Sequence, residues 1–317
     1  MIPPKEALEK TFKDIQPYIH RTPVLSSQTI NQMAGAEVFF KCENFQKMGA
    51  FKMRGGMNAV LNLSDEQRAK GVATHSSGNF AQAVALSAKL FNVKAYIIMP
   101  SNAPAVKKAA VKGYGGEVIE CDPTLKAREA TTEKIVQETG ATYLHPYNQI
   151  PVILGQGTAC MELLEDYPDL DYVLTPVGGG GLTAGTALAA YYFSKNTKVI
   201  GCEPFGADDA YISFTTGNLV PQENPNTIAD GLRTSLGDRA FPIIQQLVEE
   251  IIRVEEDEIV EALRLYWERM KIVTEPSCAV PLAALLRKKA YFAGKKVGII
   301  ISGGNVDVSA VAQLLAR

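Results

Sequence analysis

The chain has 317 residues, 46% of them hydrophobic, which is enough for one large or two modest domains with a buried core. Its net charge is −2 and no block of Lys or Arg stands out, so we expect a binder of neither nucleic acids nor membrane surfaces. The apolar runs are too short to span a bilayer, and the N-terminal segment lacks the basic start and apolar stretch of a secretory signal.

The cysteines and histidines disfavour several kinds of site. The cysteines form no C-x-x-C pair, which predicts reduced core residues in a cytoplasmic protein. They are Cys42, Cys121, Cys160, Cys202 and Cys278. The histidines at 20, 75 and 145 lie far apart in the sequence, so we expect neither a His-based zinc site nor a triad built on histidine.

Apolar runs rich in β-formers alternate with helical periodicity along the chain. Strands are predicted at 95–99, 117–121 and 141–144, with helices at 103–112 and 124–139 between them. This alternation predicts a parallel sheet with helices on both faces.

A second series follows the first. We expect strands at 172–177, 198–202 and 297–301, and helices at 182–193, from an acidic start at 255–257 to Met270, and at 309–315. The fold class is therefore α/β with two lobes. The smaller domain would span 71–148 and the larger one 1–70 and 149–317, with the ligand site in the cleft between them.

Four consecutive glycines, Gly178, Gly179, Gly180 and Gly181, lie between a predicted strand and a predicted helix. Such a run is entropically costly unless backbone N–H groups must converge on an anion at a helix N-terminus; the alternative is a permissive turn. The run matches neither the dinucleotide nor the P-loop pattern, so a single phosphate on a small cofactor fits best.

Lys52 lies between Phe51 and Met53 in N-F-Q-K-M-G-A-F-K-M-R-G-G, close to glycines. A solvated lysine needs no such surroundings, whereas a structural lysine or a nucleophile would. A nucleophilic lysine together with a one-phosphate site suggests pyridoxal phosphate.

Further motifs follow one another along nearly the whole chain. They are G-A-F-K-M-R-G (49–55), S-S-G-N (76–79), G-Q-G-T (155–158), P-V-G-G-G-G (176–181), E-P-F-G-A-D-D (203–209), T-I-A-D-G (227–231), W-E-R-M-K (267–271) and I-S-G-G-N-V-D (301–307). With them the chain resembles the fold-type II pyridoxal-phosphate enzymes, specifically the serine racemase and serine–threonine dehydratase group. The resemblance implies two lobes, each a mostly parallel sheet flanked by helices, as in the β subunit of tryptophan synthase.

The resemblance also implies which residues bind the cofactor. Lys52 becomes the lysine that forms the Schiff base, with Phe51 as an apolar wall near the ring and the four glycines around the phosphate. Ser302 matches the residue that hydrogen-bonds the pyridine nitrogen, and Asn79 the asparagine that binds the phenolic oxygen. A hydroxyl at Ser302 need not protonate the ring, which makes a weaker electron sink than a carboxylate would.

The 76–79 loop opens a predicted helix, so its free N–H groups suit an anion. By resemblance, this loop holds the substrate carboxylate through Ser76, Ser77, Gly78 and Asn79. Ser77 would also face the cofactor opposite Lys52, and racemisation needs one proton carrier on each face. Many dehydratases of the group have alanine there. The alternative for Ser77 is a helix N-cap without a proton role.

Three other positions bear on the substrate. Phe80 stands where relatives usually have histidine, and Ala50 where many have serine, so loop geometry or substrate preference could differ. Arg128, in the helix predicted at 124–139, either faces the cleft and assists a substrate carboxylate or lies on a solvated helix face.

Glu203, the Ala207 carbonyl and Asp209 match the family's divalent-cation site, with Mg²⁺, or else Ca²⁺ or Mn²⁺, as the ion. Without the resemblance this pattern is usually a solvated loop. Lys271 and Asn305 resemble residues near an ATP effector site. The resemblance also suggests a homodimer. Because the chain ends soon after its last motif, we expect no regulatory domain like that of biosynthetic threonine deaminases.

The sequence thus predicts a serine racemase with serine and threonine ammonia-lyase activity on small β-hydroxy amino acids. Lys52 would remove the Cα proton; loss of the hydroxyl then leads to a 2-oxo acid and ammonia, and reprotonation by Ser77 to the D-isomer. The nearest alternative is a threo-3-hydroxyaspartate ammonia-lyase on the same scaffold. A third is a non-catalytic protein that binds amino acids.

Overall fold

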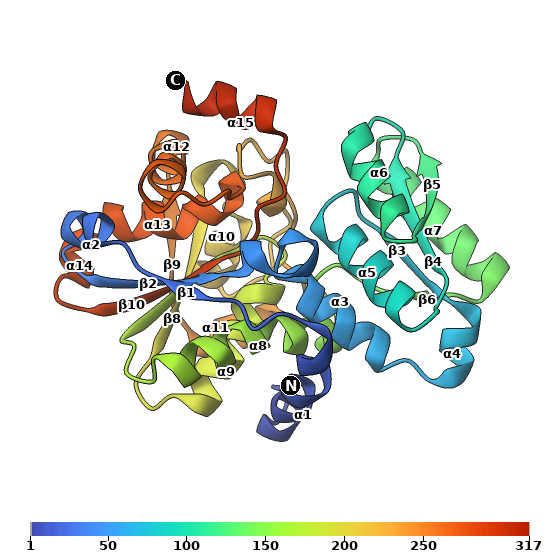
Figure 1. Cartoon of the computed structure of the whole chain (residues 1–317), viewed down its shortest axis with the longest axis horizontal. Helices are drawn as coiled ribbons and strands as arrows, with labels where there is room; N and C mark the ends of the chain where they lie inside the picture. Colours follow the sequence, from blue (N-terminus) through green and yellow to red (C-terminus); the bar gives the residue numbers. More distant parts are fainter. Residues whose placement is uncertain (1, 317) are drawn as a thin grey trace.

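Two sheets, each covered by helices, make up the computed structural model, which describes residues 2–316 (Figure 1). The larger sheet has the order β1-β2-β10-β7-β8-β9, and only β1 runs antiparallel to its neighbour. Its strands are β1 (Val24–Leu25), β2 (Glu37–Cys42), β7 (Tyr172–Pro176), β8 (Lys198–Pro204), β9 (Val248–Val254) and β10 (Lys296–Ile301).

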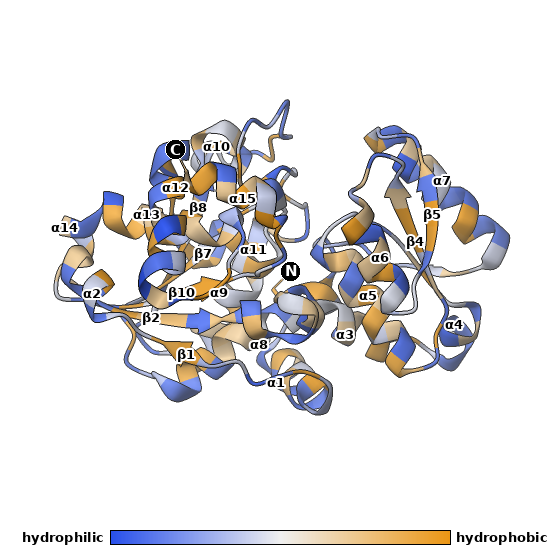
Figure 2. Cartoon of the chain, turned by 45° about the horizontal axis from the view of Figure 1, so that its top comes forward, coloured by the Kyte–Doolittle hydropathy of each residue, from blue (hydrophilic) through white to orange (hydrophobic). Residues whose placement is uncertain are grey.

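The smaller sheet is parallel throughout, in the order β5-β4-β3-β6. Its strands are β3 (Val72–His75), β4 (Ala95–Pro100), β5 (Glu117–Cys121) and β6 (Thr142–Tyr143). Hydrophobic residues run along the strands of both sheets (Figure 2). The hydrophobic core of the smaller sheet also includes Ala59, Val60 and Leu63, which precede β3.

Helices follow most strands and cover the sheets. The first group is α1 (Lys5–Ile15), α2 (Gln28–Ala34), α3 (Lys52–Leu61), α4 (Asp65–Lys70), α5 (Asn79–Leu90), α6 (Ala105–Gly113) and α7 (Leu125–Thr139). The second is α8 (Ile150–Asp166), α9 (Gly181–Phe193), α10 (Asp209–Thr216), α11 (Phe241–Leu247), α12 (Glu256–Leu265), α13 (Ala279–Arg287), α14 (Lys289–Phe292) and α15 (Val308–Leu315). Among the described residues, no helix combines the length and apolar character needed to cross a membrane.

The predicted α/β class is confirmed, and the predicted elements differ from the observed ones mainly at their ends. Strand β8 continues to Pro204, which places Glu203 inside the sheet. The helix expected to reach Met270 instead ends at Leu265 and continues as a π-helical turn over Tyr266–Met270. Four cysteines are buried as predicted, whereas Cys121 at the end of β5 is only partly buried.

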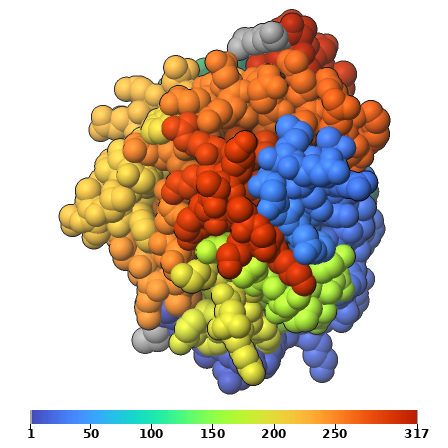
Figure 3. Space-filling model, turned by 90° about the vertical axis from the view of Figure 1, so that its left-hand side faces the viewer, coloured from blue at the N-terminus to red at the C-terminus, as the bar shows by residue number. Residues whose placement is uncertain are grey.

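The two ends of the chain meet in the larger sheet. Strand β10 pairs in parallel with β2 from Lys296 opposite Glu37 to Ile301 opposite Cys42. Figure 3 shows the consequence on one face, where segments from the blue and red ends of the sequence lie side by side. Residues that follow β2 and β10 are therefore neighbours in space.

Helix α3 lies between the two sheets and packs on both α8 and α5. Its contact with α8 is made through backbone, because a Cβ on Gly155 would lie 2.5 Å from the Arg54 carbonyl oxygen. A Cβ on Gly55 would likewise lie 2.9 Å from the Val152 carbonyl oxygen. These glycines explain why both motifs, G-A-F-K-M-R-G and G-Q-G-T, need small residues on the facing helices.

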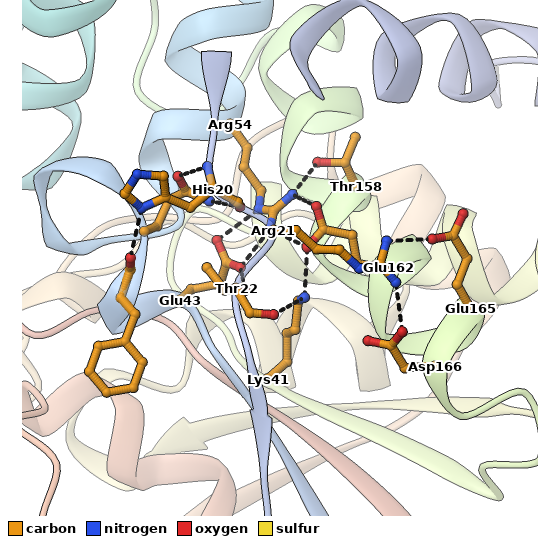
Figure 4. A network of polar contacts seen from close by, with 12 residues as sticks. His20, Arg21, Thr22, Lys41, Glu43, Arg54, Thr158, Glu162, Glu165 and Asp166 are labelled. Atoms are coloured by element: carbon orange, nitrogen blue, oxygen red, sulfur yellow. Dashed lines mark hydrogen bonds and ion pairs between the residues drawn. The ribbon is translucent and has the colours of Figure 1, made fainter. Parts of the chain in front are cut away.

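A buried network of charges holds α3 in place (Figure 4). The Arg54 guanidinium donates to Glu43 at 2.7 and 2.8 Å, to Glu162 at 2.8 and 2.7 Å, and to Thr158 at 3.2 Å. Lys41 donates to Glu162 at 2.6 Å. All five guanidinium N–H groups therefore have partners, and two cations balance two carboxylates.

Replacing Arg54 by Met should lower the free energy of unfolding by about 3–5 kcal/mol, because Glu43 and Glu162 would keep buried charges without their main partner. Urea unfolding of the cofactor-free protein measures this change. Arg21→Met is the matched control: its ion pairs with Glu165 and Asp166 are solvent-exposed, so its loss should cost less than about 1 kcal/mol. Equal losses in the two variants would contradict a special role for the buried network.

Candidate active site

One cavity of about 910 Å³ draws its lining from both sheets and the segments that join them. The predicted cofactor and substrate residues all line it: Phe51, Lys52, Ser76, Ser77, Gly78, Asn79, Arg128, Gly178, Gly179, Gly180, Gly181 and Ser302. The structure thus brings together residues separated by up to 251 positions (302 − 51). The predicted metal ligands do not line this cavity.

Lys52 begins α3 and extends into the cavity. Its Nζ donates to the Pro146 carbonyl oxygen at 2.8 Å and lies 5.0 Å from the centre of the Phe51 ring and 5.8 Å from that of Phe80. Burial among these groups lowers the pKa of Lys52 to about 8, although the Glu275 carboxyl opposes the shift. A substantial fraction of the amine is therefore neutral near physiological pH, as a nucleophile requires.

The segment before Lys52 is tied to the segment that carries Ser302. The Phe51 N–H donates to the Ser302 carbonyl oxygen at 2.9 Å, and Ala50 forms an antiparallel bridge with Gly303. The Ser302 side chain is buried, and its Oγ lies 3.3 Å from the Cys278 Sγ. The amine and the hydroxyl are thus fixed relative to each other by backbone pairing.

The glycine loop joins β7 to the N-terminus of α9. Gly180 has a φ of 81°, in the left-handed region that favours glycine. A Cβ on Gly179 would lie 2.2 Å from the Tyr147 ring, so Tyr147 can lie over the loop only because position 179 has no side chain. Free N–H groups at a helix N-terminus fit a phosphate.

The 76–79 loop ends at the start of α5, where Gly78 is the N-cap. No side chain caps this helix, which removes the alternative of Ser77 as its capping residue. Asn79 is held on both sides of its amide: Nδ2 donates to the Glu275 carboxyl at 3.1 Å, and Oδ1 accepts from Asn305 Nδ2 at 2.8 Å.

Polar side chains from the smaller sheet and its helix α7 line the same cavity. Arg128 on α7 lines it, and its buried Nε has no hydrogen-bond partner in the part of the chain that the structure describes. The Tyr143 hydroxyl is 2.7 Å from His75 Nε2, and the rings of His75 and His145 lie 6.3 Å apart. Burial, with His75 and Lys52 nearby, lowers the pKa of His145 to about 4, so its ring is neutral.

The predicted metal ligands form a separate buried site at the end of β8. Glu203 accepts from the N–H groups of Ala210 and Tyr211, while Asp209 accepts at Oδ2 from Leu236 N–H and leaves a buried Oδ1 without a partner. Burial and the neighbouring carboxylate raise the pKa of Glu203 well above its usual range, and burial raises that of Asp209 to about 6.

Two adjacent buried carboxylates with an unused oxygen fit a hard cation, which would relieve their repulsion. Within residues 2–316, no group of three or more His, Cys, Asp and Glu side chains is arranged to hold a metal. A cation between Glu203 and Asp209 would therefore need backbone oxygens, such as that of the buried Ala207, and water.

Comparison with known proteins agrees with this geometry. The family model described as "Pyridoxal-phosphate dependent enzyme" matches residues 15–303. The chain belongs to this family. It is 49% identical to serine racemase from Dictyostelium discoideum, over 97% of this chain and 96% of that protein.

Two further comparisons also cover nearly the whole chain. The beta-hydroxyaspartate dehydratase of Paracoccus denitrificans is 47% identical, over 97% of this chain and 98% of its own. The solved structure of maize serine racemase has a TM-score of 0.94 at 46% identity and covers 98% of this chain and 96% of that one. The predicted family, fold class and organic cofactor, pyridoxal phosphate, are confirmed.

Several residues of this pyridoxal-phosphate enzyme's cavity carried no signal in the sequence. Glu275 is 6% exposed yet follows Thr274 in a stretch without periodicity. Tyr147 covers the glycine loop and hydrogen-bonds Thr234 at 2.8 Å. His75 and His145, far apart in the sequence, meet because β3 and β6 are neighbours in the sheet. Only the strand order, which the sequence does not state, could have paired them.

Proposed function

We propose that this protein is a serine racemase that also acts as a serine and threonine ammonia-lyase on small β-hydroxy amino acids. The observation that carries the proposal is the presence of Lys52 and Ser77 on one cavity, which supplies two proton carriers to one substrate carbon. The D. discoideum and maize relatives, both serine racemases, support it over nearly the full chain.

The residues that would hold pyridoxal phosphate are those placed around the cavity. The glycine loop takes the phosphate, Asn79 the phenolic oxygen, Ser302 the ring nitrogen and Phe51 one wall of the ring. When bound, the cofactor withdraws electrons from the substrate Cα and makes its C–H bond acidic. The N–H groups of the 76–79 loop orient the substrate carboxylate at the start of α5.

Lys52 and Ser77 then divide the proton chemistry. The Lys52 amine, whose pKa burial lowers to about 8, takes the Cα proton and returns it at little cost near neutral pH. Departure of the β-hydroxyl leads, after hydrolysis, to a 2-oxo acid and ammonia. A proton delivered from Ser77 to the opposite side of Cα yields the D-isomer.

The Glu203–Asp209 site would hold Mg²⁺, or Ca²⁺ or Mn²⁺, in a structural or activating role, since these residues lie outside the cavity. We further propose 71–148 as a small mobile domain and the rest of the chain as the larger cofactor-binding one. The homodimer, the ATP effector near Lys271 and Asn305, and the cytoplasmic location stay predictions.

Borohydride reduction of the purified enzyme should attach the cofactor covalently to Lys52, because that amine is the nucleophile buried in the cavity. Peptide mapping by mass spectrometry locates the label. Lys47, five residues earlier in the chain and outside the cavity, is the internal control and should stay unlabelled. Label on any lysine other than Lys52 would end the assignment.

Ser77→Ala should suppress racemisation of L-serine by roughly a hundredfold or more, because one face of Cα loses its proton carrier. Elimination needs only Lys52 and should change much less. Chiral chromatography of serine together with detection of pyruvate measures both reactions in one sample. Equal losses of D-serine and pyruvate would refute the division of roles between the two residues.

A second candidate, a threo-3-hydroxyaspartate ammonia-lyase, is favoured by Arg128 and by the P. denitrificans relative. Arg128 lines the cavity and its Nε has no hydrogen-bond partner within residues 2–316, so its guanidinium is available for a second substrate carboxylate. If so, Arg128→Ala should lower kcat/KM for hydroxyaspartate by about ten- to a hundredfold and that for L-serine far less. A similar loss for both substrates would place the guanidinium on the carboxylate that they share.

A further inference from the structure

The cavity contains a buried carboxyl group, Glu275, that has no role in the proposed proton transfers. It precedes α13 and lines the cavity with 6% of its surface exposed. Both carboxyl oxygens lie 3.1 Å from Asn79 Nδ2, and the Asn305 backbone N–H also donates to the carboxyl. The Glu275 N–H in turn donates to the Gly303 carbonyl oxygen at 3.1 Å. Glu275 therefore joins the start of α5 to the segment after Ser302.

These contacts fix the orientation of the Asn79 amide. Asn305 Nδ2 donates both to Met48 O and to Asn79 Oδ1, each at 2.8 Å, so the Asn79 oxygen must point toward Asn305. If the Asn79 amide were flipped, its oxygen would face the Glu275 carboxylate and its NH₂ group would face the NH₂ group of Asn305. An amide has two N–H donors, and with one held by Glu275 the other is free for a ligand.

We propose that Glu275 is a positioning residue that aims the free N–H of Asn79 at the cofactor's phenolic oxygen and, through its own charge state, sets the strength of that hydrogen bond. The inference rests on the proposed cofactor role of Asn79. In this proposal the Glu275 carboxyl, and not the cofactor alone, controls the electron distribution near the phenolic oxygen.

The surroundings of Glu275 make its charge state sensitive to pH. Burial and the nearby Asp230 carboxylate raise the pKa of Glu275 to about 7, whereas Lys107 on α6 opposes the shift. Lys52 and the Cys278 thiol are the other titratable neighbours. Above neutral pH the charged carboxylate accepts a strong hydrogen bond from Asn79 and disfavours negative charge on the phenolic oxygen. Below neutral pH the protonated carboxyl binds Asn79 more weakly and does not repel that negative charge.

The test compares the visible absorption of the cofactor-loaded wild type with that of Glu275→Gln across the neutral pH range. Gln keeps an acceptor for Asn79 but cannot titrate. The wild-type spectrum should change with a midpoint near pH 7, and the Gln variant should show no such transition. Glu261→Gln, an exposed glutamate on α12, removes the same charge elsewhere and should titrate like the wild type.

A second variant keeps the charge but loses the position. In Glu275→Asp the carboxyl is one methylene shorter, so it should still titrate while the dissociation constant for pyridoxal phosphate, measured by equilibrium dialysis, rises roughly three- to tenfold. Wild-type titration in the Gln variant, or unchanged affinity in the Asp variant, overturns the proposal. Failure of the wild type to bind the cofactor at all would instead overturn the proposed function.

Discussion

The placement of α3 on α8 is the constraint on which the site depends. Lys52 is the first residue of α3, and Arg54, two residues later, is fully buried and shared between Glu43 and Glu162. Burying four charges is costly, and the cost is offset only when every partner is in place. The network therefore admits one orientation of the helix, and the amine at its N-terminus inherits that orientation.

The pairing of β2 with β10 extends this constraint to the rest of the cofactor site. Gly49 and Gly304 join through a backbone hydrogen bond of 2.9 Å, and a Cβ on Gly49 would lie 2.8 Å from Asn305 Oδ1. Gly49 also has a φ of 77°, so both its backbone conformation and its closeness to Asn305 require glycine. Lys52, Ser302 and Asn305 thus form one rigid group, and Asn79 from α5 joins it through Glu275 and Asn305.

The sequence predicted the features that depend on short stretches of neighbouring residues. Buried strands appear in the sequence as continuous apolar runs, and a glycine run between a strand and a helix indicates a tight loop, so the parallel sheets and the glycine loop could be predicted. The roles of Glu275, Glu43 and Glu162 could not, because the sequence does not tell whether a carboxyl faces water or a buried partner. Glu162 lies 108 positions from Arg54, and Glu275 lies 196 positions from Asn79. For the same reason the sequence allows two orientations of Arg128, since only the neighbouring sheet decides which face of α7 is covered.

The cavity divides its work between the two sheets. The groups fixed around Lys52 belong to segments of the larger sheet and α3, whereas Arg128, His75 and Tyr143 come from α7, β3 and β6 of the smaller one. Substrate side chains can therefore be selected by residues that do not touch the buried network under Lys52. Relatives of nearly equal identity, 49% and 47%, carry the names of a racemase and of a hydroxyaspartate dehydratase, so overall similarity alone does not set the substrate. Because Ser77 follows β3, the smaller sheet also brings the second proposed proton carrier to the cavity that Lys52 enters from α3.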